Sequence, residues 1–357
     1  MTDELQTIID LIRYGASRFN AAGLTFGHSF DNALDEATQL TLHALHLPHD
    51  IGPAYGQARV TLAEKEEVLG LFLRRIEERI PAAYLTGETW FAGLSFKSDP
   101  RALVPRSPIA ELIEGGFQPW IGDREVRHAL DLCTGSGCIA IAMGHYNPDW
   151  HVAGVDLSDD ALALAQENKA RLHADNVRLL KSDLFSKLQG EHYDLIVTNP
   201  PYVTNAETDA LPREYSYEPD LGLRAGDDGL DLALKILRDA PLHLTDEGLL
   251  ICEVGEAEQA LVKLLPELPR DKILAANTAQ QVLEMAAGID LASIPDKPGA
   301  RGKARVVGTA EAPSQSIDDF IEQEAAERPW KTLARSHAQR FAFLIAGAGT
   351  QALCVRL

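Results

Sequence analysis

The chain has 357 residues, of which 45% are hydrophobic and 24% are charged. This composition is typical of a folded, globular protein of about two domains, and it excludes a fibrous or disordered chain. The 53 Asp and Glu residues outnumber the 33 Lys and Arg residues, and the net charge of −20 would repel phosphate backbones over most of the surface. The charge therefore disfavours a broadly basic nucleic-acid binder, whereas a basic protein partner would be attracted.

The cysteines and apolar runs bear on the cellular compartment. Cys133, Cys138, Cys252 and Cys354 form no CxxC pair, so we expect neither a disulfide framework nor a zinc ribbon. The first residues are acidic where a secretory signal would be basic, and no run reaches the roughly 18 apolar residues of a membrane span. These features predict a cytoplasmic protein. We expect no metal site, because the histidines within residues 43–49 have no carboxylate or cysteine to complete a ligand set.

The beginning of the chain is typical of a helical domain. Apolar residues recur at helical spacing over residues 5–12 and 34–45. A third helix is expected from Thr61, which has a glutamate three residues on in a capping-box pattern, to the stop at Pro81. We therefore predict a small helical domain over residues 1–88.

A connecting region follows at residues 89–125. An aromatic, extended run from Trp90 to Phe96 opens it. Further on, Ser107 can cap a helix and Pro108 can occupy its first position. We interpret this region as a hinge or hairpin linker followed by a short connecting helix.

From about residue 126, strands alternate with helices, which is the pattern of a parallel sheet with right-handed crossovers. The strands are expected at residues 128–133, 151–157, 177–180, 193–198 and 249–254. The helices are expected at residues 138–145, 158–172, 231–237 and through 261–265. The sequence thus predicts a doubly wound α/β domain over residues 126–270.

The last part of the chain, residues 271–357, is an atypical, alanine-rich tail. Its predicted elements are loops at 299–303 and 310–316, an acidic helix at 317–327, and a terminal hairpin that pairs 341–346 with 352–357.

One glycine-rich turn indicates a nucleotide-type cofactor. The run from Asp131 to Gly137 lies between a predicted strand and a predicted helix, where glycines let the backbone approach a ligand at the helix N-terminus. Asp156 ends the next strand, where a carboxylate can accept both hydroxyls of a ribose. Together these residues indicate a cofactor with an adenosine group. A nicotinamide dinucleotide and S-adenosylmethionine both fit this much.

A second motif, Asn199-Pro200-Pro201-Tyr202, follows the fourth predicted strand. Two prolines cannot donate backbone hydrogen bonds and they fix φ, so we expect a rigid, extended turn. A planar NH₂ group can then be held by the Asn199 side-chain oxygen and the Pro200 carbonyl, with Tyr202 as a flat face to stack on. An amide nitrogen is a poor nucleophile because its lone pair is delocalised; holding both N–H bonds favours pyramidalisation and aims the lone pair for in-line displacement.

With these motifs the chain resembles the N(5)-glutamine methyltransferases, class I S-adenosylmethionine-dependent enzymes. The resemblance covers about residues 1–270 and also rests on Tyr84-Leu85-Thr86-Gly87, Trp90-Phe91-Ala92-Gly93, Leu103 to Ile109, Ser182-Asp183-Leu184-Phe185, Glu218-Pro219 and Gly226 to Asp231. Within the family the chain is most similar to the branch that modifies a glutamine of large-subunit ribosomal protein L-three. The branch that acts on peptide release factors usually has an acidic residue after its Pro-Arg, where this chain has Ser107, and a glycine at the place of Cys133.

The resemblance implies a fold and a cofactor site. The fold is α/β and Rossmann-like, with a seven-stranded sheet and a small N-terminal helical domain that recognises the substrate. S-adenosyl-L-methionine would be held through its methionine part, its ribose and its adenine. The implied residues are, in that order, Asp131 with Cys133, Thr134, Gly135, Ser136 and Gly137; then Asp156; then Asp183 and Leu184, with Asn199 also beside the cofactor.

The resemblance also implies a substrate site and a partner. Asn199, Pro200, Pro201 and Tyr202 would hold the glutamine, with Asn199, Pro200 and Tyr202 in the catalytic role. Arg106 would close over the site or contact the substrate backbone. The partner would be a basic protein, ribosomal protein L-three of the 50S subunit or an assembly intermediate that carries it, with no membrane contact and no direct reading of nucleic acid.

Several alternative functions remain at this point. One is methylation of the release-factor glutamine. Another is methylation of a nucleobase amine, since Asn-Pro-Pro-Tyr also occurs in DNA adenine methyltransferases, although such enzymes need a basic surface that this sequence lacks. A non-catalytic binding module and a nicotinamide oxidoreductase are disfavoured, because both motifs are intact and no hydride-transfer acid follows the fourth strand. The tail departs from the family, whose members usually end soon after the sixth strand with an aromatic-containing hairpin.

Overall fold

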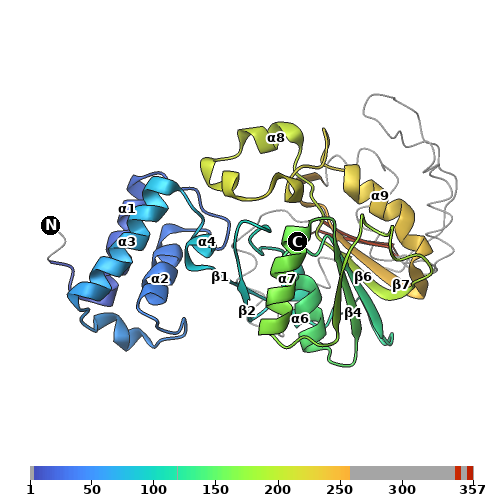
Figure 1. Ribbon diagram of the computed structural model, residues 1–357, viewed down its shortest axis with the longest axis horizontal. Coiled ribbons are helices and arrows are strands. Elements are labelled where there is room, and N and C mark those ends of the chain that lie inside the picture. Colours follow the sequence, from blue (N-terminus) through green and yellow to red (C-terminus); the bar gives the residue numbers. More distant parts are fainter. Residues whose placement is uncertain (1–3, 119, 258–341, 347–351, 357) are drawn as a thin grey trace, which may run out of the picture. The chain divides into compact units, whose positions relative to one another are not determined.

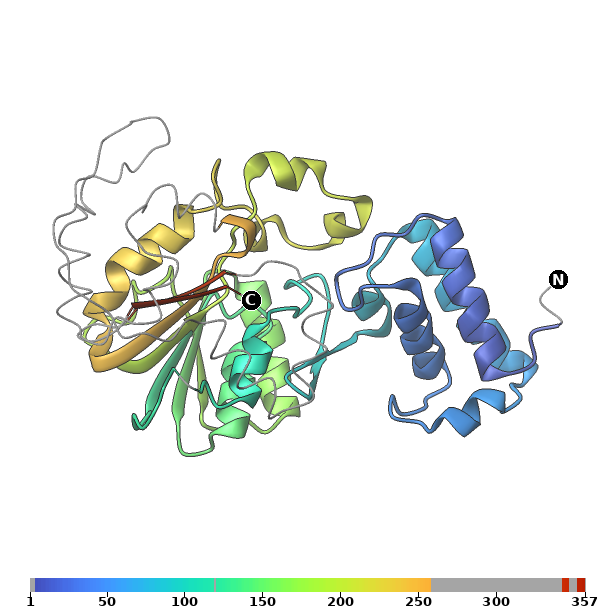
Figure 2. The same cartoon turned by 180° about the vertical axis from the view of Figure 1, so that it is seen from behind.

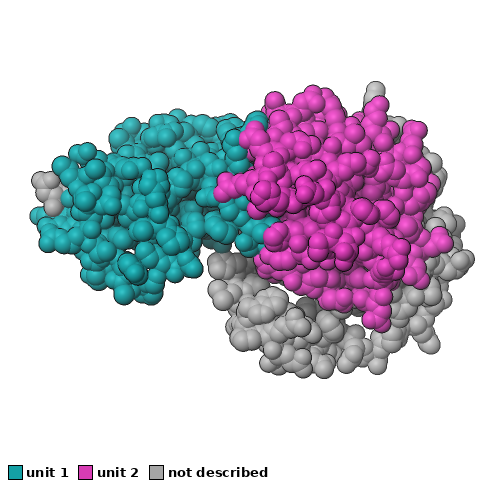
Figure 3. Space-filling model, turned by 60° about the horizontal axis from the view of Figure 1, so that its bottom comes forward, with its two compact units in different colours: residues 1–106, 210–219 teal, residues 107–209, 220–357 magenta. Residues whose placement is uncertain are grey.

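The computed structural model describes residues 4–118, 120–257, 342–346 and 352–356 (Figure 1, and from behind in Figure 2). The chain divides into two compact units (Figure 3). Unit 1 comprises residues 1–106 and 210–219, and unit 2 comprises residues 107–209 and 220–357. Four predicted elements lie outside the described residues: the helices through 261–265 and at 317–327, and the loops at 299–303 and 310–316.

Unit 1 is built on the three helices that the sequence predicts. Its elements are α1 (Ile8–Ala21), α2 (Ala33–Ala44), a 3₁₀ turn (Pro53–Gln57), α3 (Leu62–Glu78), α4 (Ala82–Thr86) and the antiparallel hairpin of β1 (Glu88–Phe91) and β2 (Leu94–Lys97). The predicted capping box is confirmed: the Thr61 hydroxyl accepts from the Glu64 amide, and the Glu64 carboxylate accepts from the Thr61 amide. Phe19 and Phe72 meet edge to face in the core, with 5.2 Å between ring centroids.

A buried arginine holds this helical unit together from inside. Arg75 of α3 is fully buried and donates to the Glu36 carboxylate at 2.7 Å and to the Thr25 carbonyl at 2.8 Å. Its third nitrogen lies 3.7 Å from the Glu214 carboxylate, which comes from a distant part of the sequence. Burial raises the pKa of Glu36, while the charge of Arg75 opposes that rise.

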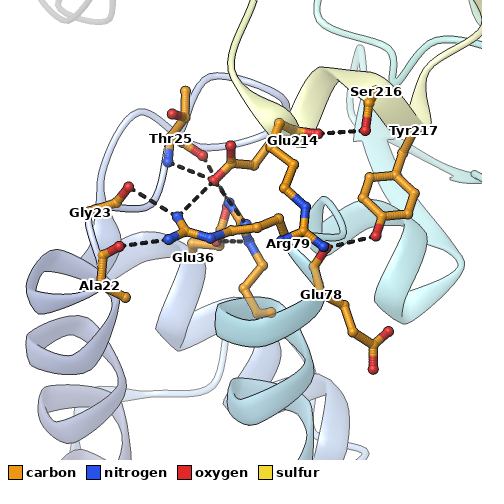
Figure 4. Close-up of polar contacts among 11 residues, drawn as sticks. Ala22, Gly23, Thr25, Glu36, Glu78, Arg79, Glu214, Ser216 and Tyr217 are labelled. Atoms are coloured by element: carbon orange, nitrogen blue, oxygen red, sulfur yellow. Dashed lines mark hydrogen bonds and ion pairs between the residues drawn. The ribbon is translucent and has the colours of Figure 1, made fainter.

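The segment 210–219 completes unit 1, and the sequence did not indicate this placement. It contains the 3₁₀ turn Arg213–Tyr217. The Glu214 carboxylate accepts from the Thr25 amide at 3.0 Å and from Arg79 at 3.2 Å, and the Tyr217 hydroxyl donates to the carbonyl of Glu78 (Figure 4). Two parts of the chain more than a hundred residues apart are therefore joined by buried charge.

Unit 2 is a doubly wound domain, as predicted. Its strands are β3 (His128–Leu132), β4 (His151–Asp156), β5 (Val177–Lys181), β6 (Tyr193–Thr198), β7 (Leu244–Glu253), β8 (Ala342–Ala346) and β9 (Ala352–Arg356). They form one seven-stranded sheet in the order β5-β4-β3-β6-β7-β8-β9, parallel from β5 to β7, with β8 antiparallel to both β7 and β9. The helices are α5 (Ile109–Glu114), α6 (Cys138–Tyr146), α7 (Asp159–Arg171), α8 (Asn205–Ala210) and α9 (Asp231–Asp239), and short 3₁₀ turns cover Asp220–Gly222, Ala240–Leu242 and Gly255–Ala257. The predicted terminal hairpin is confirmed as the pair β8 and β9.

Helices cover both faces of the parallel part of the sheet. Successive side chains of a strand point to opposite faces. On one face, Ala153 and Val155 of β4 belong to the same hydrophobic cluster as Ala233 and Ile236 of α9. On the other face, Gly154 lies so close to α6 that a Cβ there would be 3.1 Å from that of Ala140. This arrangement leaves the carboxyl ends of the strands as the edge where ligands bind in such sheets.

One strand begins earlier than the sequence predicts. The sequence predicts this strand from residue 249, after the polar residues Thr245 to Gly248. In the structure β7 already begins at Leu244, which pairs with Tyr193, and the register shifts before Leu249 pairs with Leu195. This register shift accommodates the polar residues Thr245 to Gly248 within β7.

The buried Arg75 pair predicts a large stability effect in unit 1. Glu36→Ala removes a buried carboxylate from a fully buried guanidinium, and we expect it to lower the free energy of unfolding by about 3–5 kcal/mol. Urea unfolding followed by circular dichroism measures the change. Glu78→Ala is the matched control, because its pair with Arg74 on α3 is exposed on both sides; we expect a loss below about 1 kcal/mol. Equal losses in the two variants would contradict the assigned role of Arg75.

Candidate active site

The two predicted motifs leave the sheet side by side. Leu132 is the last residue of β3 and pairs in parallel with Thr198, the last residue of β6. The Thr198 hydroxyl also donates to the Leu132 carbonyl at 2.8 Å. The segments that follow, beginning at Cys133 and Asn199, therefore start from adjacent positions at one edge of the sheet. Because both strands lie in unit 2, this juxtaposition belongs to a single compact body.

The glycine-rich turn adopts the backbone that its sequence predicts. Cys133, Gly135 and Gly137 all have positive φ, at 59°, 55° and 81°. Gly137 is the N-cap of α6 and provides no side chain to cap it. A Cβ at Gly137 would lie 3.0 Å from that of Ala165 in α7, so the turn is packed closely against the next helix. Cys133 holds a left-handed conformation that ordinarily costs a non-glycine residue on the order of 1 kcal/mol.

Asp131 lies beneath this turn with one oxygen unpaired. It is fully buried, and its Oδ2 atom accepts from the Thr134 hydroxyl at 2.5 Å and from the Ala140 amide at 3.0 Å. Its Oδ1 atom is buried and has no hydrogen-bond partner within the described residues. Burial raises the pKa of Asp131 to about 7. A buried acceptor without a donor is rare in folded proteins, and it suits a site that a polar ligand group completes.

Asp156 closes the turn from the end of β4. Its two carboxylate oxygens accept from the Gly135 amide at 2.8 Å and from the Ser158 amide at 2.9 Å. Burial raises the pKa of Asp156 above its usual value, against the lowering effect of these backbone donors. Its own carbonyl accepts from the Ser182 amide at 2.9 Å, directly before Asp183. The residues predicted for methionine, ribose and adenine thus lie at or just after the carboxyl ends of three neighbouring strands, β3, β4 and β5.

The Asn199–Tyr202 segment is held at its last residue. The two prolines are buried, and Asn199 and Tyr202 are half-buried. The Tyr202 hydroxyl donates to the Glu253 carboxylate at 3.1 Å. Sequence reasoning missed Glu253, although one signal was present: this acidic residue directly follows the apolar run Leu249–Cys252.

Arg106 belongs to unit 1 and is bound there. Its guanidinium bonds both oxygens of the buried Glu218 carboxylate, which also accepts from the Val104 amide at 3.1 Å. Nearby, His28 lies 3.9 Å from Glu218, and burial lowers the pKa of this histidine to about 4. Arg106 is therefore an ion-paired residue with 27% of its side chain exposed. A role of Arg106 in substrate binding stays a prediction.

Two kinds of feature are absent from the described residues. Within the ranges that the structure describes, no group of three His, Cys, Asp or Glu residues is placed to hold a metal ion. No helix in those same ranges has the length and apolar character needed to cross a membrane.

The fold and the site define a methyltransferase of the class I, doubly wound type. A family model described as "Methyltransferase small domain" matches residues 120–213. Over 266 residues the chain is 82% identical to "Ribosomal protein uL3 glutamine methyltransferase" of Xanthomonas campestris pv. campestris, an alignment that covers 74% of this chain and 86% of the relative. Proteins of the same name from Xylella fastidiosa strain 9a5c (75% over 266 residues, 74% and 85% covered) and Bordetella pertussis (47% over 282 residues, 78% and 95% covered) are also similar. The chain belongs to the family of ribosomal protein uL3 glutamine methyltransferases, which confirms the resemblance seen in the sequence.

The raised pKa of Asp131 predicts a pH-dependent stability. Between about pH 4 and pH 7 the folded protein keeps a proton that the unfolded chain has released, so the free energy of unfolding falls as the pH rises through this range. Asp131→Asn keeps an oxygen for Thr134 and Ala140 and removes the ionisation. We expect the stability of the wild type relative to this variant to decrease from pH 4.5 to pH 8 in urea unfolding. A constant or increasing difference would contradict the assignment.

Proposed function

We propose that this protein transfers a methyl group from S-adenosyl-L-methionine to the side-chain amide nitrogen of a glutamine in ribosomal protein uL3. One observation carries the proposal: in a chain of this family, Asn199-Pro200-Pro201-Tyr202 starts beside the glycine-rich turn, at the same edge of one sheet. An amide-holding motif and a cofactor turn must be neighbours for in-line transfer. The names of the relatives favour uL3 over a release factor or a nucleobase as the substrate.

The cofactor site is supported by the donors and acceptors around the turn. Methyltransferases in general use S-adenosyl-L-methionine, and bound there it would supply a methyl group activated by a positively charged sulfur. In this proposal Asp131 and the Cys133–Gly137 backbone hold the methionine part, Asp156 the ribose, and Asp183 with Leu184 the adenine. The unpaired, buried Oδ1 atom of Asp131 fits this assignment, because it is an acceptor that the protein itself leaves unsatisfied.

The substrate residues act by orientation. The Asn199 side-chain oxygen and the Pro200 carbonyl accept the two N–H bonds of the glutamine amide, and the Tyr202 ring supports its plane. The two prolines keep this turn extended, since neither can leave its fixed φ. A protein base is not needed, because the methylated amide is acidic enough to lose a proton to water.

The partner in this proposal is a basic protein. The net charge of −20 favours approach of a basic ribosomal protein, whether free or within an assembly intermediate, and such complementarity speeds capture more than it sets final affinity. Arg106 remains a proposed contact for the substrate backbone. We place the reaction in the cytoplasm, where bacterial ribosomes are assembled.

The direct test is mass spectrometry after incubation with S-adenosyl-L-methionine. The panel is unmethylated uL3, a peptide release factor and a short DNA duplex. We expect one added methyl group on a glutamine of uL3 alone. Asn199→Ala should abolish this transfer while changing cofactor affinity less than about threefold, because it removes an amide acceptor and leaves the turn intact. Methylation of the release factor alone would move the proposal to the sister branch, and methylation of DNA would overturn it.

Asp156→Ala tests the cofactor half of the site. The substitution removes the proposed ribose acceptor and the bond to the Gly135 amide. We expect it to weaken S-adenosyl-L-methionine binding by about 1.5–3 kcal/mol, as measured by calorimetry. Asp159→Ala is the control, because this residue lies three positions on and pairs with the exposed Lys181. Unchanged affinity in Asp156→Ala would refute the ribose assignment.

A further inference from the structure

The buried carboxylate of Glu253 joins three separate segments of unit 2. Glu253 is the last residue of β7 and is 1% exposed. Its Oε1 atom accepts from the Tyr202 hydroxyl at 3.1 Å, and its Oε2 atom accepts from the Ser107 hydroxyl at 2.5 Å. Hydrogen bonds to a carboxylate are stronger than those between neutral groups. The motif residue Tyr202 is thereby tied to the neighbouring strand.

Strand pairing explains why Glu253 reaches the motif. In the parallel ladder of β6 and β7, Thr198 pairs with Cys252. The next residue on β7 is Glu253, and Asn199 directly follows the end of β6, so the carboxylate stands at the level where the Asn199–Tyr202 segment leaves the sheet. A residue one position earlier would point to the opposite face.

Tyr202 is confined on two further sides by glycines. A Cβ at Gly255 would lie 2.4 Å from the Tyr202 ring, and a Cβ at Gly229 would lie 2.3 Å from its carbonyl oxygen. Both glycines have positive φ, 46° and 76°. The backbone at Gly255 and Gly229 therefore approaches the ring and the carbonyl closely, and the hydroxyl adds a directional hydrogen bond that fixes the ring.

We propose that Glu253 is a positioning residue for methyl transfer: it fixes the ring of Tyr202 through the phenolic hydroxyl and so sets the face that supports the substrate amide. This inference rests on the proposed function of Tyr202. The rate of in-line transfer depends strongly on the positions of the reacting atoms, and a misplacement of 1 Å can lower it about 100-fold. A ring that is less firmly held therefore lowers kcat. We expect cofactor binding to be unaffected, because Tyr202 and Ser107, whose hydroxyls bond the Glu253 carboxylate, are not among the residues assigned to the cofactor.

The kinetic test combines four variants with purified uL3. Tyr202→Phe keeps the ring and removes the hydroxyl, and Glu253→Leu keeps the volume and removes the acceptor. We expect each to lower kcat about 10-fold, with KM for S-adenosyl-L-methionine unchanged. The kcat of the double variant should lie within about twofold of the kcat of the slower single variant, because both substitutions remove the same interaction. Glu253→Gln retains an acceptor oxygen and should restore kcat to within about threefold of the wild type.

Ser107→Ala is the matched control. It removes a different hydrogen bond of the same carboxylate and leaves the one to Tyr202, so kcat should stay within about twofold of the wild type. Any of three results would overturn the proposal. The first is a double variant whose fold-loss in kcat equals the product of the two single losses. The others are a Glu253→Gln variant as slow as Glu253→Leu, and a Ser107→Ala variant as slow as Tyr202→Phe.

A second measurement needs no substrate. Val203 and Asn205 donate their amides to the Leu223 and Gly226 carbonyls, so hydrogen exchange in residues 202–205 reports how firmly the segment is held. We expect faster exchange there in Glu253→Leu and Tyr202→Phe, and wild-type exchange in Ser107→Ala. Unchanged exchange in the first two variants would overturn the positioning role. If the wild type leaves uL3 unmethylated, the proposed function fails, and exchange alone then decides the role of Glu253.

Discussion

The parallel pairing of β3 with β6 is the constraint on which the candidate site depends. Leu132 and Thr198 end their strands as register partners, and the Thr198 hydroxyl bonds the Leu132 carbonyl. A shift of one residue in this register would turn every side chain of β6 to the other face. It would also separate the starts of the two motifs. The relative position of the two motifs in the candidate site is thus set by the pairing of β3 with β6, and the loops that follow these strands start from positions already fixed by it.

A second constraint acts on the chain that follows the motif. Seven residues separate Tyr202 from the start of segment 210–219, which is part of unit 1. That segment is held by carboxylates that are almost fully buried, Glu214 near Arg75 and Arg79, and Glu218 on Arg106. Breaking a buried charge pair on one side leaves an unpaired charge, which costs about 3–5 kcal/mol. Movement of segment 210–219 away from the helices of unit 1 is therefore opposed by these charge pairs.

The sequence predicted the elements of the fold better than it predicted the contacts between them. Periodic apolar spacing, the capping box at Thr61 and the glycine-rich turn are local patterns, and each was confirmed. The start of β7 was wrong because the polar residues after Leu244 look like a turn, while the pairing with Tyr193 depends on a neighbouring strand. Nothing near Glu214 distinguishes it from the many other acidic residues, since its partners lie more than a hundred positions away.

The same reasoning explains which site residues were visible in the sequence. Asp156 and Asn199 stand out because the first lies at the end of a predicted strand and the second directly follows one, each within a recognisable motif. Glu253 also ends a strand, yet its meaning depends on the Tyr202 hydroxyl, a contact made across the sheet between residues 51 positions apart. The three carboxylates at this edge each accept hydrogen bonds from neighbouring segments. Asp131 accepts from the Thr134 hydroxyl of the turn and the Ala140 amide of α6, Asp156 accepts from the Gly135 amide, and Glu253 accepts from two hydroxyls. The proposed transfer needs no protein base. In that proposal these carboxylates therefore contribute by holding the turn, the Asn199–Tyr202 segment and the cofactor in position, and none of them has to remove a proton.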